Sequence, residues 1–418
     1  SNLLDLYAAV DIPEIEGFGL SDFKIKGLRT DPGHTRPNYS DVSMLKYASS
    51  AAHVTGKRLT SSETFTWLTE HFRTSLSQMK PDLDLMFTCG VNNIFFHGTC
   101  YSPKDDPWPG WKFYASIDMS PTNTIWRDAP YMMQYIERSQ SFLQMGQPDN
   151  DFLVYLPVRD MWKKRMKEGA DGLLMQFDIH SMDKIAPEFI RSILAIDSLG
   201  YDCDYISDKQ LQNVTVKDGR IVTPANTQYK ALIIPSGATL NEAMKKQLEA
   251  LAPYVIYGED DSRMQQFAEP EAIRRTHRLR AIRRKNDEGH HYFIANLTPN
   301  DVNDTVRIAV DCKAALWYNP MNGEISRATV TPEGIHMALR SGESLILKTL
   351  NDGSQILPAI KESSNKNETI TLDNPWTLTF TEEQPAIAES LTLTATQTRE
   401  ARTDVNRVMG GTGIYTTT

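Results

Sequence analysis

The sequence predicts a mixed α/β and all-β fold: the C-terminal part of a (β/α)8 barrel of the TIM type, then a flavodoxin-like α/β unit, then β-sandwich-type units. Three observations lead to this prediction. Residues 1–148 alternate short apolar segments with helical periodicity, as the strands and helices of a parallel sheet do. From residue 149 the alternation restarts with fully apolar strands. After residue 273 it gives way to short alternating strands separated by turn signals.

Residues 1–148 contain three strand–helix units. The expected strands are LYAAVDIPE, RLTSSE and NNIFFHG, and the expected helices cover residues 40–54, 67–79 and 128–145. A closed barrel needs eight such units. We therefore expect the first part of the barrel to be absent from the chain, and the exposed sheet edge to favour pairing with a second copy.

Residues 149–272 alternate strands such as DFLVYLP and KALIIPSG with helices at 187–199 and 241–251. This order is typical of an open flavodoxin-like sheet. Its loops lack both GxGxxG and GxxxxGKS, so we expect an independent structural or assembly unit with no nucleotide and no organic cofactor.

Residues 273–350 predict a small all-β domain with turns at Asp287-Glu288-Gly289 and Asn322-Gly323. A linker follows at residues 351–367. Residues 368–418 read as the start of a β-sandwich of the galactose-binding type, which we expect to be truncated.

Composition narrows the class of partner. The 418-residue chain has a formal net charge of −9, which argues against nucleic acid or an anionic membrane as partner. It contains no apolar run long enough for a membrane span. The basic segment at residues 274–285 lacks interleaved aromatics, so we interpret it as a solvated domain junction. The four cysteines are widely spread, and we expect free thiols, with a Cys89–Cys100 disulfide as the alternative.

The candidate chemistry lies where two strands end. Glu63 closes one expected strand and His97 closes the next, one β-α-β unit further along. Because a parallel barrel builds its active site at the carboxyl ends of its strands, we expect both side chains to line one pocket. The alternatives are a helix-capping role for Glu63, an ordinary core or loop position for His97, and no shared pocket.

Five segments together resemble glycoside hydrolase family 106, the α-L-rhamnosidases of bacteria that degrade plant polysaccharides. They are ASSAAH at residues 48–53, GK at 56–57, SETFT at 62–66, GVNNIFFHG at 90–98 and PGWKFY at 109–114. The resemblance implies an inverting hydrolase with two carboxylates about 6.5–9.5 Å apart. It implies that Glu63 is the general base. The family's general acid lies on an earlier strand, in a segment similar to D-S-x-E that does not occur here, so we expect little activity from this chain alone.

The resemblance also implies a carbohydrate substrate and a set of substrate-binding residues: His97, Glu16, Glu14, Trp108, Trp111 and His53. Asp11 and Glu16 are candidate ligands for a calcium ion, with a solvated acidic turn as the alternative. A periplasmic or secreted bacterial location follows from the resemblance, since a signal peptide cannot be judged from this sequence. The competing functions are a non-catalytic carbohydrate-binding or scaffold protein and another barrel glycosidase such as a β-galactosidase.

Overall fold

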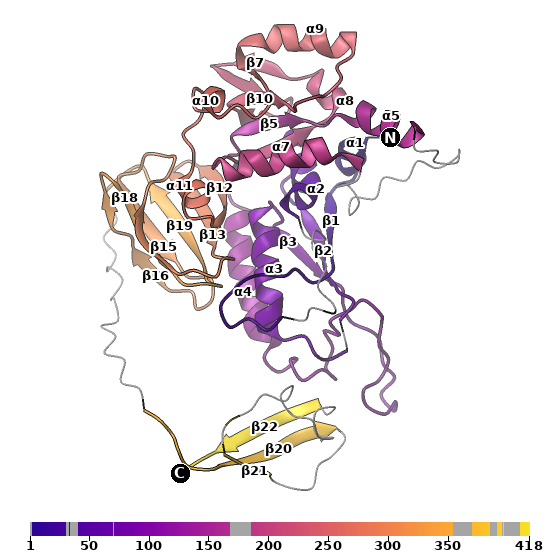
Figure 1. Cartoon of the computed structure of the whole chain (residues 1–418), viewed down its shortest axis with the longest axis vertical. Coiled ribbons are helices and arrows are strands. Elements are labelled where there is room, and N and C mark those ends of the chain that lie inside the picture. The colour runs from indigo at the N-terminus through magenta and orange to yellow at the C-terminus, as the bar shows by residue number, and fades with distance from the viewer. Residues whose placement is uncertain are drawn as a thin grey trace.

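The computed structural model in Figure 1 combines α/β and all-β parts built on several sheets. It describes residues 2–30, 33, 41–69, 71–167, 185–353, 370–384, 391–394, 396 and 410–418. The linker expected at residues 351–367 falls outside the described residues from 354 onward.

The first sheet has three parallel strands in the order β1-β2-β3. Its elements are β1 (Glu14–Phe18), α2 (Val42–Thr55), β2 (Ser61–Thr66), α3 (Leu76–Thr88), β3 (Asn93–Phe96) and α4 (Ala129–Leu143). The predicted β-α-β-α-β-α order is therefore present, and β1 and β3 are the edges of this sheet within the described residues.

Two boundaries in this region differ from the sequence prediction. The segment expected to be a strand from residue 6 begins as a helix, α1 (Leu3–Ala8), whose first turn is capped by the Asn2 side chain, and the strand starts only at Glu14. The second helix, expected from residue 67, starts at Leu76, where Ser75 and Gln78 form a capping box. Local capping thus set the helix ends more strongly than apolar spacing did.

The second sheet is parallel throughout, in the order β11-β10-β5-β6. Its strands are β5 (Phe152–Tyr155), β6 (Cys203–Ile206), β10 (Ala231–Ile234) and β11 (Val255–Tyr257). Its helices are α5 (Val158–Lys167), α7 (Pro187–Ser198), α8 (Asp208–Leu211), α9 (Glu242–Leu251), a 3-10 turn (Ala252–Tyr254) and α10 (Asp261–Met264). A small antiparallel sheet, β7 (Thr215–Lys217), β8 (Arg220–Val222) and β9 (Gln228–Tyr229), is inserted before β10. When the parallel strands are numbered along the chain and read across the sheet from β6 to β11, their order is 2-1-3-4. This is the flavodoxin-like order.

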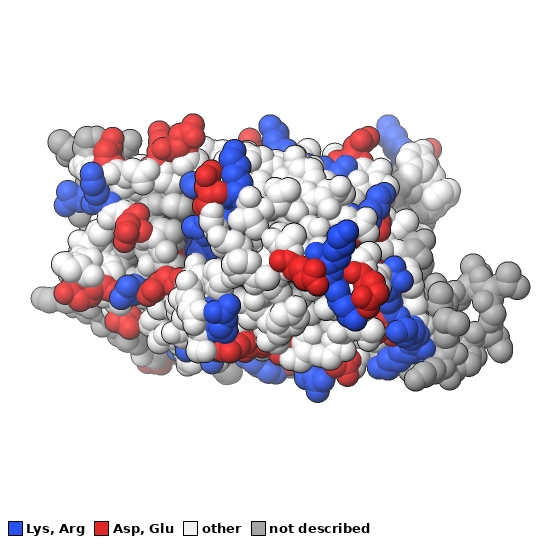
Figure 2. Space-filling view, turned by 90° about the horizontal axis from the view of Figure 1, so that it is seen from above, with Lys and Arg blue, Asp and Glu red and all other residues white. Residues whose placement is uncertain are grey.

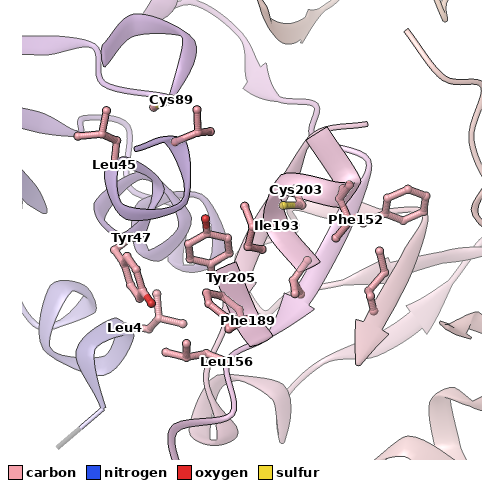
Figure 3. Packing of buried hydrophobic residues seen from close by; sticks show 14 of the residues in the cluster. Leu4, Leu45, Tyr47, Cys89, Phe152, Leu156, Phe189, Ile193, Cys203 and Tyr205 are labelled. Atoms are coloured by element: carbon pink, nitrogen blue, oxygen red, sulfur yellow. The ribbon is translucent and has the colours of Figure 1, made fainter. Parts of the chain in front are cut away.

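The first two sheets share one hydrophobic core, so the α/β unit is not independent as the sequence suggested. Tyr47 of α2 lies edge-on to Tyr205 of β6, and both rings contact Phe189 of α7. Figure 3 shows Leu4 and Leu45 at the same junction. Helix α2 is buried on nearly every side. Because such a helix has no face left for water, it must pack against a partner on both sides.

The third unit is a two-layered β structure. Its six-stranded sheet has the order β16-β15-β19-β13-β12-β4, and a three-stranded sheet, β14-β18-β17, packs over it. The strands are β4 (Gln147–Pro148), β12 (Arg280–Asn286), β13 (Gly289–Ala295), β14 (Val302–Val306), β15 (Ala314–Tyr318), β16 (Ile325–Arg327), β17 (Val330–Thr331), β18 (Gly334–Leu339) and β19 (Ser344–Leu350). The other face of the six-stranded sheet packs on α3 and α4, which lie between it and the first sheet (Figure 1).

The basic segment at residues 274–285 lies at a junction, but only part of it is solvated: Arg278 and Lys285 are exposed. It forms the end of α11 (Ala272–Arg275) and most of β12, and Arg274, Arg283 and Arg284 are buried. Arg274 pairs with Asp197 and Asp202 of the α/β unit. Arg283 pairs with Asp149, Asp151 and Glu271, whereas Arg284 donates to the backbone carbonyls of Met145 and Gly146. On the surface seen in Figure 2, acidic and basic side chains are interspersed.

The C-terminal strands form a small antiparallel sheet in the order β21-β20-β22, with β20 (Trp376–Gln384), β21 (Leu391–Leu393) and β22 (Gly410–Thr416). All four cysteines carry free thiols. No helix in the described part of the chain is both long and apolar enough to span a membrane.

Candidate active site

Glu63 lies on the face of the first sheet that the helices leave open. Its register partners are Glu16 on β1 and Phe95 on β3, so the three residues form one row across the sheet. Alternate residues of a strand point to opposite faces. Ile15 and Ser62, one position away, are accordingly buried on the helix side, whereas the Glu63 side chain is 40% exposed.

The structure brings Glu63 and His97 together. The distance from Glu63 Oε1 to His97 Nε2 is 3.9 Å. Glu63 is the third residue of β2 rather than its last, and it caps no helix. His97 directly follows β3, and its backbone N–H donates to the carbonyl of Thr64 on β2. The parallel pairing of β2 and β3 thus places the two side chains next to each other.

Hydrogen bonds hold both groups in a defined orientation. His97 Nδ1 lies 2.7 Å from the carbonyl oxygen of Ala115. A carbonyl can only accept, so Nδ1 carries a proton and the Nε2 of a neutral ring presents its lone pair toward Glu63. Thr66 Oγ1 donates to Glu63 Oε1 at 3.3 Å. Phe113 packs edge-on against the imidazole, with ring centroids 5.3 Å apart.

The gap between carboxylate and imidazole suits a bound hydroxyl. At 3.9 Å the two groups do not bond directly. One water molecule, which has two O–H donors, can bridge them, or a sugar hydroxyl can donate to either one. A half-exposed carboxylate held in this way can take a proton from water, which is the work of a general base. No role was predicted from the sequence for Thr66 or Phe113, although they lie in the segments SETFT and PGWKFY. The contact through Ala115 uses a backbone carbonyl, which leaves no motif.

The two other acidic residues of β1 lie on the same face. Ser61 Oγ donates to Glu14 Oε2 at 2.7 Å. Glu16 is the register partner of Glu63, and register partners on neighbouring strands have backbones about 4.8 Å apart. Burial, and then the charge of Glu16, raise the pKa of Tyr7 on α1 to about 12. Glu14, Glu16 and Glu63 therefore form one acidic face.

The predicted calcium ligands do not form a cage. Calcium takes about six to eight oxygen ligands. Asp11 is an exposed residue before β1, and Glu16 lies within the strand. Across the described residues, no three or more His, Cys, Asp or Glu side chains are grouped to hold a metal ion.

The two predicted tryptophans differ in exposure. Trp108 donates from Nε1 to the carbonyl of Thr122 and packs against Phe72, so it supports the loop that follows β3. Trp111 is 59% exposed and lies edge-on to Tyr101. An exposed indole with an apolar face can stack on a sugar ring. Trp111 is accordingly the better candidate for substrate contact.

His53 is not at this site, which corrects the sequence prediction. It is buried at the end of α2, and its Nδ1 lies 3.0 Å from Oδ2 of Asp204 on β6. Tyr229 donates to the same carboxylate at 2.8 Å. His53 thus joins α2 to the α/β sheet. Its partner lies about 150 residues away in the chain, so no local pattern could reveal it.

Comparison with known proteins places this geometry in a family. The model of glycoside hydrolase family 106, described as alpha-L-rhamnosidase, matches residues 20–260, which is more than half of the chain. A rhamnosidase from Novosphingobium sp. PP1Y superposes with a TM-score of 0.64 over 96% of this chain and 40% of its own length. At 14% identity this likeness shows the fold alone.

A protein of Formosa agariphila named "Putative beta-glucuronidase" is 28% identical over 210 residues, which cover 49% of this chain and 15% of that protein. The chain thus spans less than half the length of either relative. Together with the shared fold and the carboxylate–imidazole pair on the sheet face, the family match identifies the sequence: the chain belongs to glycoside hydrolase family 106.

Proposed function

We propose that this chain carries part of the active site of an enzyme that removes terminal α-L-rhamnosyl residues from plant polysaccharides with inversion, and that Glu63 is its general base. The observation that carries the proposal is the placement of Glu63 beside His97 on the open sheet face. The family match supports the choice of sugar.

In the proposed reaction, Glu63 takes a proton from a water molecule as the water oxygen attacks the anomeric carbon. The glycosidic C–O bond breaks, and the leaving oxygen takes a proton from a general acid. His97, with Nδ1 held by Ala115, accepts a hydrogen bond from a sugar hydroxyl. Trp111 stacks on the substrate.

We place the general acid outside the three strands of this sheet. Glu16 is the nearest carboxylate by register, but its backbone lies only about 4.8 Å from that of Glu63. Inverting enzymes need about 6.5–9.5 Å between their carboxylates to leave room for the water. We therefore propose that Glu16 binds a substrate hydroxyl. For Glu14, whose Oε2 accepts from Ser61 Oγ on the same face, we also propose substrate binding.

The test uses the full natural gene product and 4-nitrophenyl α-L-rhamnoside. Glu63→Gln should lower kcat by about 10²–10⁴-fold, because the loss of a general base costs that much. The matched control is Glu288→Gln, since Glu288 lies on the β unit and pairs with Lys348. A Glu63→Gln variant with parental kcat would overturn the proposal. If the parent protein itself binds the rhamnoside but does not hydrolyse it, the protein is a carbohydrate-binding protein instead.

A parallel assay with an aryl β-D-glucuronide is motivated by the Formosa agariphila relative. We expect the rhamnoside to be hydrolysed at least tenfold more efficiently, as kcat/KM. The opposite ranking would assign the site to a uronide.

Because plant polysaccharides are met outside the cell, we also propose that the protein works in the periplasm or the medium. Fractionation of the native host would test this location, and activity confined to the cytoplasm would contradict it.

A further inference from the structure

A buried four-residue segment in the loop after β3 contacts two histidines, His97 and His71. This orienting segment comprises residues 115–118, and all four residues are buried. Ser116 Oγ accepts from the backbone N–H groups of Gly98 and Asp118, each at 3.0 Å. It also donates to the carbonyl of Gly98 at 3.1 Å. The segment is thereby fixed to the residue that follows His97.

The backbone of the orienting segment is strained at both ends. Ala115 has a φ of 55° and Asp118 a φ of 53°, although neither is a glycine. Phe72, in the loop after β2, also has a left-handed φ of 60°. Such conformations persist only where surrounding contacts impose them, and they concentrate at functional sites.

The far end of the segment holds a second imidazole. Asp118 Oδ2 lies 2.6 Å from Nδ1 of His71, which belongs to the loop after β2. The Asp118 side chain is 5% exposed and that of His71 is 37% exposed. A buried carboxylate that accepts from Nδ1–H fixes the tautomer of the ring. The Nε2 atom of His71 is then the nitrogen left for an outside group.

His71 and His97 are oriented in the same way. Each ring is held at Nδ1 by an oxygen of the orienting segment, one from Ala115 and one from Asp118. Three residue steps separate these anchors, so their Cα atoms lie within about 11 Å of each other. Both loops leave the carboxyl ends of neighbouring parallel strands, where ligands of such sheets bind.

We propose that His71 is a second sugar-binding residue of the Glu63 site, whose Nε2 accepts a hydrogen bond from a hydroxyl of the bound glycoside. The inference rests on the proposed function. It adds a contact between the substrate and the loop that follows β2. Asp118 is a positioning residue that acts through His71.

The experiment uses substitutions that separate the two ring nitrogens. In His71→Asn, the amide replaces Nδ1 and keeps the bond to Asp118 but removes Nε2. In His71→Gln, the longer amide reaches the position of Nε2. With the natural gene product and 4-nitrophenyl α-L-rhamnoside, we expect His71→Asn to raise KM about tenfold and His71→Gln to recover part of the loss. Tm should stay within about 1 °C. The control His277→Asn, on the β unit, should leave KM unchanged.

A binding measurement covers the case in which a variant unfolds. In the parent protein, the Cε1–H resonance of His71 should shift on titration with L-rhamnose. Asp118→Asn, whose amide can donate to Nδ1 and so favour the Nε2–H tautomer, should raise KM and leave kcat unchanged. An unshifted resonance, or an unchanged KM in a folded His71→Asn, would overturn the inference. If Glu63→Gln is inactive while His71→Asn is unaffected, only this inference fails. If Glu63→Gln is fully active, the proposed function fails, and the titration still decides the role of His71.

Discussion

Removal of the Arg283 side chain should destabilise the junction between the α/β unit and the β unit more than any change of a surface charge. Its Nε donates to Asp149 Oδ2 at 2.5 Å, its Nη1 to Glu271 Oε1 at 2.8 Å and its Nη2 to Asp151 Oδ1 at 3.0 Å. The guanidinium is 7% exposed. Although burial acts to raise it, Arg283 and Lys230 hold the pKa of Asp151 below its usual value.

The expected magnitude follows from the charges that would be left behind. Arg283→Ala removes the cation shared by three carboxylates, of which Asp151 and Glu271 are buried. Within the described residues, Asp151 then keeps only Lys230 as its paired cation, and Glu271 keeps the hydrogen bond from Tyr292 but has no paired cation. Breaking a buried ion pair from one side costs about 3–5 kcal/mol. With an unfolding entropy of about 2.1 cal/mol/K per residue, a cooperative unfolding of the whole chain would lose about 3–6 °C in Tm.

The assay is thermal unfolding followed by circular dichroism, with Arg340→Ala as the matched control. Arg340 pairs with Glu343, but its side chain is 80% exposed, and such surface pairs contribute about 0–1 kcal/mol. Equal, small Tm shifts for the two variants would refute the claim that the Arg283 network holds the junction.

Three further predictions concern other residues. Burial raises the pKa of Asp82 to about 7, although the side chain and backbone of Ser21 act to lower it. The free energy of unfolding of the parent therefore falls as the pH rises from about 4 to about 7. In urea titrations, Asp82→Asn should be up to about 4 kcal/mol more stable than the parent by about pH 8. A difference in stability that does not change with pH would contradict this. His53→Gln should lower the free energy of unfolding by about 3 kcal/mol and leave the KM for rhamnoside unchanged, because His53 pairs with buried Asp204. A raised KM in a variant with the parental Tm would indicate that His53 contacts the substrate. Trp111→Ala should raise KM with Tm unchanged, whereas Trp108→Ala should lower Tm. The reverse pattern would indicate that Trp108 contacts the substrate and Trp111 supports the loop.

The sequence predicted the part of the site that depends on local order. Glu63 lies in β2 and His97 directly follows β3, the next strand along the chain, so the parallel pairing of these strands places them side by side. His53 failed as a prediction because its partner, Asp204, lies on a strand of another sheet. The position of His71 depends on Asp118, a loop residue that no periodicity describes.

The fold shows the same division. Strands with regular apolar patterns, such as β5 and β10, were found where expected. Strand β12 was not predicted, because its arginines indicated a solvent-exposed segment. Their burial depends on acids of another unit, including Asp151 and Asp197, so composition within a short window could not reveal it.

The most direct test of the role of Glu63 is chemical rescue of Glu63→Ala in the full natural gene product. Without the carboxylate, water is poorly activated, but azide needs no general base and can attack the anomeric carbon itself. With an aryl α-L-rhamnoside of good leaving group, azide should restore turnover, and proton NMR should show β-L-rhamnosyl azide, the product of inversion. The absence of rescue in a folded variant, or formation of the α-azide, would contradict Glu63 as the general base of an inverting rhamnosidase.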